Sequence, residues 1–498
     1  MHRICIDEAE TKERDHRYHN GSNSILQNGA IGSPQGVSIF PHPKWLNTRS
    51  EGDSESRPIS TDEPDNQAIV SELPPVDRGR GAWTYLLVAF LVEGLCWGFP
   101  FSYGVFQAYY SRTESFAGSN QLSAVGVLSS GIPYLSSLFV FPIISRYLNQ
   151  RKNMMWFGLF LCFLSCIASS FATKVWHLML SQGALYGCGT VLLYTPTFSL
   201  MNEWFVKRRG LAYGVMFAGT GCSGLVLPFL FERLLSKYGH HTTLRIWGIV
   251  LVVMTSPVLY LMKPRLPVSA TTRHPDAVHR PMEWIDWSFL KSRSFHVFAF
   301  ANFFQGLGYF LPGIYLPSYA LDLSLPPVKS TIVLSIFNLA SVFGQIGLGW
   351  LSDNCDIYLV MFGSTSVSAV AVYLLWGLSK SFGVLVAFAI IYGLSAGGFS
   401  AMWTRFGSVI SGDDSSSSVL TLIGVFSFQR GIGNILSGPI SSALVGSTVF
   451  KGSDGDIGYG LRKYEGVVLF VGSAMLVSCL GVGGRLLKPT GAPNTLHD

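Results

Sequence analysis

The chain contains few charged residues: Asp, Glu, Lys and Arg make up 13% of its 498 residues. A soluble globular domain usually carries about twice that fraction. Apolar residues make up 49% of the chain, and its mean hydropathy is +0.36. These values exclude an ordinary soluble domain and indicate a protein that is in contact with lipid.

The chain also lacks the motifs of common catalytic and cofactor sites. It contains no Gly-x-x-x-x-Gly-Lys-Ser/Thr phosphate loop, no His-Glu-x-x-His pair and no Cys-x-x-Cys pair. Six of its eight cysteines lie in apolar segments, where a packing role fits them better than a disulfide or metal framework. The net charge of +6 fits basic loops at a membrane surface, so no nucleic-acid partner is expected. We therefore expect neither an enzyme nor a bound cofactor or metal.

Long apolar segments fill most of the chain. MMWFGLFLCFLSCIASSFA and GVVLFVGSAMLVSCLGVGG, for example, approach the roughly 20 residues that a helix needs to cross a bilayer core. Continuous apolar segments of this length fit helices, which form all their backbone hydrogen bonds internally, rather than the shorter alternating strands of a barrel. The sequence predicts an all-α polytopic membrane protein with twelve spans, at about 83–109, 122–145, 154–173, 177–201, 210–235, 244–262, 295–320, 328–351, 357–378, 382–405, 417–445 and 465–486.

The spans fall into two sets of six, which indicates two helical bundles joined by a linker. The predicted organisation is a disordered tail over 1–80, bundles over 81–262 and 294–487, a polar linker over 263–293 and a short tail over 488–498. Basic residues concentrate in the loops after spans two and four, which places both termini in the cytosol. The loop after span five departs from this rule through Arg233, Lys237 and Arg245. The first twenty residues are charged, so no secretory signal is expected, and we predict a plasma-membrane location.

One segment, EWFVKRRGLAYGVMFAGTGCSG at 203–224, carries a dense family signature. It resembles the fifth-helix motif of monocarboxylate-transporter-like members of the major facilitator superfamily. Gly210, Gly214 and Ala218 recur every fourth residue and give one helix face a groove that a neighbouring helix can approach closely. The resemblance implies helix-packing or gating roles for these three residues and for Gly219, with Lys207 and Arg208 at the cytosolic end.

Two shorter segments extend the resemblance. WGFPFSYGVFQAYY at 97–110 is similar to the fungal branch of the family, and GQIGLGWLSD at 344–353 resembles the Gly-x-Leu-x-Asp loop after span eight. In the family such loops lock the cytosolic face, which implies a gating role for Asp353. The resemblance implies the major facilitator fold of two six-helix bundles and transport by alternating access.

Ionisable residues at mid-depth are rare in the predicted spans, and Glu93 and Arg430 are the exceptions. Intramembrane charges usually face a bundle interior or a cavity, so both are candidates for a substrate site. Helical spacing places other polar and aromatic residues on the same inward faces. These candidate substrate-binding residues are Asn434 with Arg430 on span eleven, Trp97 with Glu93 on span one, Asn302, Gln305 and Tyr309 on span seven, and Asn338 and Gln345 on span eight.

Arg430 either contacts an anionic ligand or is paired structurally with Glu93 or backbone carbonyls. Glu93 either carries a proton or is hydrogen-bonded to a neighbouring helix. In monocarboxylate carriers of this family, proton and substrate binding is attributed to a lysine in the first helix and an Asp/Arg pair in the eighth. Neither is present here at mid-depth. We therefore expect a secondary carrier for an organic anion or small amphipathic metabolite, with possible proton coupling. The alternatives are efflux of a secondary metabolite and a transport-inactive nutrient sensor.

Overall fold

The computed structural model describes residues 73–114, 116, 121–266, 287–412, 416–446 and 458–485. Most of the predicted N-terminal tail, most of the predicted linker and the predicted C-terminal tail lie outside these residues. The chain divides into the units Met1–Glu63 and Pro64–Asp498, and every described residue belongs to the second unit.

All regular elements in the described ranges are helices, so the all-α fold class is confirmed. In chain order they are α2 (Gly79–Phe101), α3 (Tyr103–Tyr110), α4 (Leu122–Arg146), η1 (Leu148–Gln150), α5 (Arg151–Ser169), α6 (Val175–Leu178), η2 (Met179–Leu185), α7 (Tyr186–Trp204), α8 (Arg209–Leu261), η4 (Trp287–Lys291), α10 (Arg293–Asp322), α11 (Pro327–Asn354), α12 (Ile357–Val370), η5 (Ala371–Trp376), α13 (Phe382–Ala396), η6 (Phe399–Met402), α14 (Trp403–Ser411), α15 (Ser416–Leu444), η7 (Tyr459–Leu461), α16 (Glu465–Cys479) and η8 (Leu480–Arg485).

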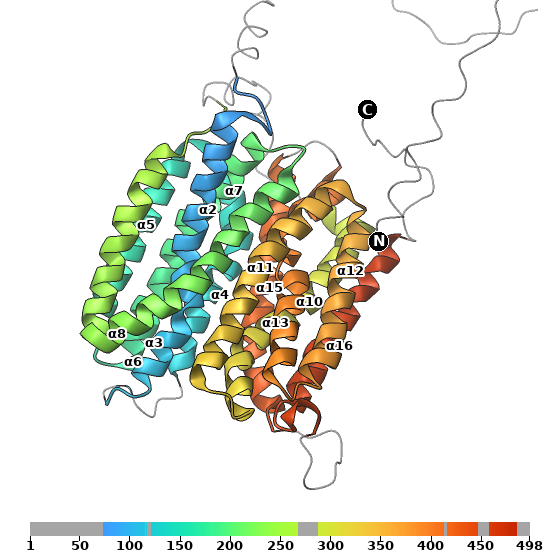
Figure 1. The fold of residues 1–498 in the computed structure, drawn as a ribbon. Helices are drawn as coiled ribbons and strands as arrows, with labels where there is room; N and C mark the ends of the chain where they lie inside the picture. Colours follow the sequence, from blue (N-terminus) through green and yellow to red (C-terminus); the bar gives the residue numbers. More distant parts are fainter. Residues whose placement is uncertain are drawn as a thin grey trace, which may run out of the picture. The chain divides into compact units, whose positions relative to one another are not determined.

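Ten helices in the described part of the chain are long and apolar enough to cross a membrane. One of them, α8, has 53 residues, which would make a straight helix about 80 Å long, whereas a bilayer core is about 30 Å thick. Its backbone leaves helical geometry at Gly239, where φ is +71°. Figure 1 shows its two limbs running in opposite directions from this turn, so α8 provides predicted spans five and six.

Predicted span four is divided among α6, η2 and α7, which follow one another without a gap from Val175 to Trp204. The middle piece, η2, is a π-helix, which has a wider turn than an α-helix. With this span and the two limbs of α8, the described residues contain all twelve predicted spans. Their ends agree with the prediction within a few residues, except that span ten continues to Ser411.

The helices form two halves, residues 73–266 and 287–485, which meet along two pairs of helices. The first limb of α8 packs on α11, and α4 packs on α15. In Figure 1 the blue-to-green helices of the first half lie beside the yellow-to-red helices of the second. We call the end with the loops at 147–150 and 205–208 the basic side, after its Arg and Lys residues, and the other end the opposite side.

Glycines allow α8 and α11 to approach closely. A Cβ atom on Gly349 would lie 2.3 Å from the Gly210 carbonyl oxygen, and one on Gly214 would lie 2.3 Å from the Gln345 carbonyl oxygen. Gly219 faces the other way, toward α2, where its Cβ would lie 2.3 Å from the Phe90 carbonyl oxygen. The regularly spaced small residues of α8 therefore contact two different helices, one in each half.

The Gly210–Gly349 contact leads to a stability prediction. Gly349→Ala would force the two backbones apart, and overpacking of this kind typically costs about 1–3 kcal/mol. Gly347→Ala on the same helix is the matched control, because its added Cβ meets no atom of another described helix within 4 Å and Ala favours a helix over Gly by about 1 kcal/mol. We expect a lower melting temperature of the purified protein for Gly349→Ala only. Equal melting temperatures would contradict the close contact.

Candidate functional site

Arg430 lies on α15 where that helix crosses α10. The side chain is 3% exposed, and its Nη1 donates a hydrogen bond to Gln305 Oε1 of α10 at 2.8 Å. The two backbones are close here, because a Cβ on Gly433 would lie 2.6 Å from the carbonyl carbon of Gly306. The predicted inward face of α15 is thus turned toward α10, and the guanidinium is enclosed by protein.

Aromatic rings surround the Arg430 guanidinium. Its central carbon lies 4.1 Å from the ring centroid of Tyr309, 5.4 Å from that of Phe310 and 5.8 Å from that of Trp403. Rings within about 6 Å attract a cation through their negative faces. Tyr134 of α4 also interacts with Arg430, and its ring lies 6.4 Å from that of Phe310. The cluster therefore combines residues of both halves.

Amide side chains hold this cluster in place. Asn302 donates to the Phe426 carbonyl oxygen at 3.0 Å and to Gln429 Oε1 at 3.1 Å, and its own Oδ1 accepts from Trp403 Nε1 at 2.8 Å. Gln305 donates to the Ala396 carbonyl oxygen at 3.2 Å while it accepts from Arg430. These buried amides therefore fix the orientation of the Trp403 ring and of the guanidinium.

Arg430 has no carboxylate partner within 4.0 Å among the described residues. In particular, it forms no ion pair with Glu93, so this alternative from the sequence is wrong for the conformation seen here. An unpaired buried charge is costly, and one hydrogen bond with cation–π contacts offsets only part of the cost. The guanidinium retains further N–H donors and the fork geometry that suits a carboxylate.

Glu93 lies on α2 and contacts α8 of its own half. Its side chain is 4% exposed; Oε1 accepts a hydrogen bond from Thr220 Oγ1 at 3.2 Å, and Oε2 has no hydrogen-bond partner among the described residues. The helices are close here, since a Cβ on Gly94 would lie 3.0 Å from the Gly219 carbonyl oxygen. Glu93 is therefore hydrogen-bonded to a neighbouring helix, which is one of the two hypotheses that the sequence left open.

Trp97 connects the Glu93 helix to the aromatic cluster. Its ring lies 4.8 Å from that of Tyr134 and 5.4 Å from that of Tyr194, and its buried Nε1 has no acceptor among the described residues. Tyr134 in turn interacts with Arg430. A continuous run of aromatic side chains thus extends from the first half to the guanidinium.

Three other predicted site residues lie at the contact between the halves. Asn434 donates to Ser130 Oγ of α4 at 3.1 Å, and Asn338 donates to the Gly224 carbonyl oxygen of α8 at 3.1 Å. The Gln345 backbone packs on Gly214, while its buried Oε1 has no partner among the described residues. The sequence predicted that these side chains point into the interior of the protein. Asn338 and Asn434, however, form hydrogen bonds with the first half instead of lining one site with Arg430.

Two carboxylates on the basic side, those of Asp353 and Asp77, accept hydrogen bonds from backbone N–H groups. Asp353 at the end of α11 accepts from Gly210 N and Leu211 N, both at 2.8 Å, at the first turn of α8. Asp77 accepts from the N–H groups of Val206, Lys207 and Arg208. The side chains of Lys207 and Arg208 are exposed. Helix N-termini favour carboxylates, so Asp353 links the two halves electrostatically.

The sequence did not identify several residues of the cluster. Tyr134, Phe310 and Trp403 are ordinary aromatic residues in apolar runs, and their contact with Arg430 depends on how four helices are rotated and spaced. Trp403 follows a break in span ten at Gly397 and Gly398, and such a break is the one local signal that could have pointed to it.

Comparison with known proteins agrees with the resemblance carried by residues 203–224. Residues 85–438 match the family model of the Major Facilitator Superfamily. An MFS-type transporter of Gibberella zeae is 28% identical over 84% of this chain and 91% of the relative. MFS-type transporter 1 of Ophiocordyceps sp. is 25% identical over 85% and 92%, and monocarboxylate transporter 11 of Mus musculus is 30% identical over 74% and 82%.

The Asn302 amide provides a test of the cluster. Asn302→Leu would leave the buried Trp403 Nε1 without its acceptor, which costs about 1–3 kcal/mol, and would also remove the donor to the partly buried Gln429 Oε1. The control is Asn354→Leu, which removes a hydrogen bond to the Trp350 carbonyl oxygen at an exposed site. We expect a lower melting temperature for Asn302→Leu and a quenching or shift of tryptophan fluorescence. Identical curves for both variants would contradict the arrangement.

Proposed function

Because the chain belongs to the Major Facilitator Superfamily, we propose that this multi-pass membrane protein is a secondary carrier for an organic anion or small amphipathic metabolite. The observation that carries the proposal is the buried Arg430, which is enclosed by aromatic rings and has no carboxylate partner among the described residues. The relatives of this chain are named transporters, which supports transport as the activity.

The proposed ligand site follows from the chemistry around Arg430. A substrate carboxylate would accept from N–H groups at the edge of the guanidinium once the site opens, because the ring of Tyr309 covers its face. The apolar part of the substrate would pack on Tyr134, Phe310 and Trp403. A compact polar anion would gain little from these rings, so a substrate with an apolar or ring-bearing body fits better.

The contacts between the halves suggest how the carrier moves. Asp353 bonds the first turn of α8, and Ser137 Oγ donates to the Gly424 carbonyl oxygen at 2.8 Å, which joins α4 to α15. In alternating access the two halves rock about a midplane site, so these contacts on the basic side would break when that side opens. We propose that the basic side faces the cytosol and that the protein resides in the plasma membrane.

Glu93 is the proposed proton site of the carrier. A buried carboxylate that has one hydrogen bond, and no ion pair among the described residues, is strongly disfavoured as an anion, so we propose that Glu93 holds a proton in this conformation. Release of the proton would require that the site opens to water. Uptake and efflux both remain compatible with such a site, since gradients set the direction.

The first test is made on Arg430. Metabolites inside and outside cells with and without the gene are profiled to find the transported compound and its direction. Arg430→Ala should then abolish transport of that compound, because the charge partner is gone, while the amount of protein in the membrane stays the same. Arg112→Ala is the control, since Arg112 is an exposed arginine just after α3. Full activity of Arg430→Ala would refute the site.

The second test is made on Glu93. Glu93→Gln imitates the protonated acid and retains a carbonyl oxygen for Thr220, so the protein should fold. We expect its transport rate to lose the pH dependence of the natural protein. Glu114→Gln, at an exposed position, should keep that dependence. A Glu93→Gln profile that follows the natural one would reduce Glu93 to a packing role.

A further inference from the structure

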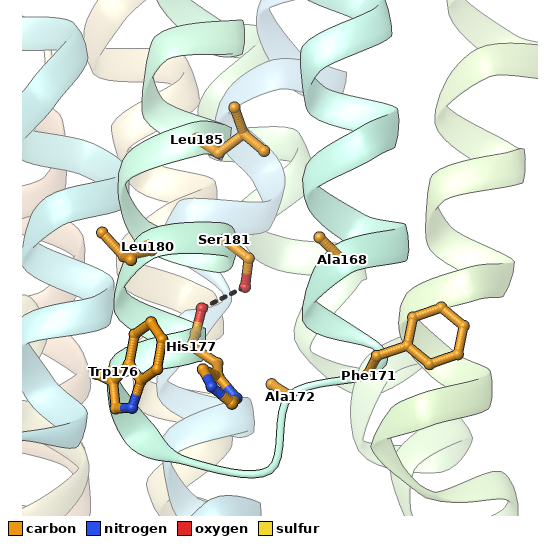
Figure 2. A pocket seen from close by; sticks show the side chains of 8 residues that line it. All are labelled: Ala168, Phe171, Ala172, Trp176, His177, Leu180, Ser181 and Leu185. Atoms are coloured by element: carbon orange, nitrogen blue, oxygen red, sulfur yellow. Dashed lines mark hydrogen bonds between the residues drawn. The ribbon is translucent and has the colours of Figure 1, made fainter.

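A groove opens on the surface of the first half, between the end of α5 and the segment formed by α6 and η2. Its volume is about 310 Å³. Figure 2 shows Ala168 on one wall and Trp176, Leu180 and Leu185 on the other, with the loop that carries Ala172 closing one end. None of its lining residues contacts Arg430 or belongs to the aromatic cluster around it, and nothing in the proposed transport cycle uses the groove.

The local sequence explains why there is space here. The π-helix of η2 widens the helix from Met179 to Leu185. The facing Ala168 of α5, and Ala172 in the loop at the end of the groove, are too small to fill the gap. Leu180 is 59% exposed, so the groove is open to its surroundings. In a membrane-spanning helix those surroundings are lipid.

The residues that line the groove are apolar except Ser181 and His177. Ser181 is the one hydroxyl in the wall, and it donates to the His177 carbonyl oxygen at 2.6 Å (Figure 2). Its backbone carbonyl accepts from Ser165. From His177 to Leu185 the wall extends about 12 Å along the helix axis. At the mouth lie His177 and the interfacial Trp176, a residue type that favours the headgroup level.

Two cations belong to, or contact, the chain segment that connects the two walls of the groove. Lys174 is exposed in the loop between the walls, and the exposed Arg245 of α8 stacks on Phe171, with its guanidinium carbon 4.7 Å from the ring centroid. Arg245 Nε also donates to Ser170 Oγ at 3.1 Å. Residues 151–202 and 236–261 contain no Asp or Glu, and neither cation forms an ion pair among the described residues. Arg245 is one of the basic residues that depart from the charge rule.

We propose that this groove binds a glycerophospholipid of the adjoining leaflet, with an acyl chain along Ala168, Leu180 and Leu185 and its phosphate held by Lys174 and Arg245. The apolar floor matches the chain, and the two unpaired cations match the phosphate. A sterol would fill the groove without using either charge. A phosphate at this site would also explain why Arg245 lies in the predicted loop after span five, which the distribution of basic residues assigns to the non-cytosolic side.

The test is photo-labelling of the purified full-length protein in mixed micelles. The probe is phosphatidylglycerol with a diazirine on one acyl chain, and the matched probe is the diacylglycerol with the same chains. We expect phosphatidylglycerol to label peptides within 168–185 more strongly than diacylglycerol does. Ala168→Trp should lose this labelling, whereas Val253→Trp, at a 63% exposed position of α8, should retain it.

A charge variant keeps the test decisive if Ala168→Trp does not fold. Lys174→Gln combined with Arg245→Gln should lower phosphatidylglycerol labelling to the diacylglycerol level, and size-exclusion chromatography checks that the protein is intact. The proposal is overturned if both probes label residues 168–185 equally in the natural protein. It is also overturned if labelling spreads evenly over the lipid-facing helices, or if only a sterol diazirine probe labels the groove. Transport is not measured, so failure here leaves the proposed carrier function untouched.

Discussion

The close contact of α8 with α11 is the constraint on which the arrangement of the two halves depends. In lipid no hydrophobic force drives helices together, so backbone proximity and polar bonds must hold them. Gly210 and Gly349 allow this proximity, and Asp353 then reaches the first turn of α8. Because this pairing sets the distance between the halves, it also determines which residues of α4, α10 and α15 meet at mid-depth.

Arg430 is held in a position from which it cannot reach water easily. A long basic side chain near a helix end can extend to the membrane surface, but this one lies between α10 and α15 and bonds Gln305. Neutral partners therefore compensate its charge: one amide oxygen and the faces of aromatic rings. Such partners stabilise the cation without neutralising it, which leaves an electrostatic preference for an anion at the same place.

The mid-depth polar residues serve two different purposes, and the structure separates them. Asn302 and Gln305 support the Arg430 cluster, while Asn338 and Asn434 bond the opposing half. The sequence cannot distinguish these two groups, because both occupy inward helix faces. Such a face includes the contact between the halves as well as any space between them. A contact that must form and break in alternating access can use single hydrogen bonds, which are individually weak.

The sequence by itself determined the helical class, the twelve spans and the exceptional character of Glu93 and Arg430, because length, hydropathy and charge act locally along the chain. It also identified the small-residue face of α8, since helical spacing follows from the backbone. Only the tertiary structure decided that Arg430 bonds Gln305 instead of Glu93, and that Tyr134 and Trp403 belong to its surroundings. Those choices depend on the rotation and spacing of helices distant in sequence, which no local pattern encodes.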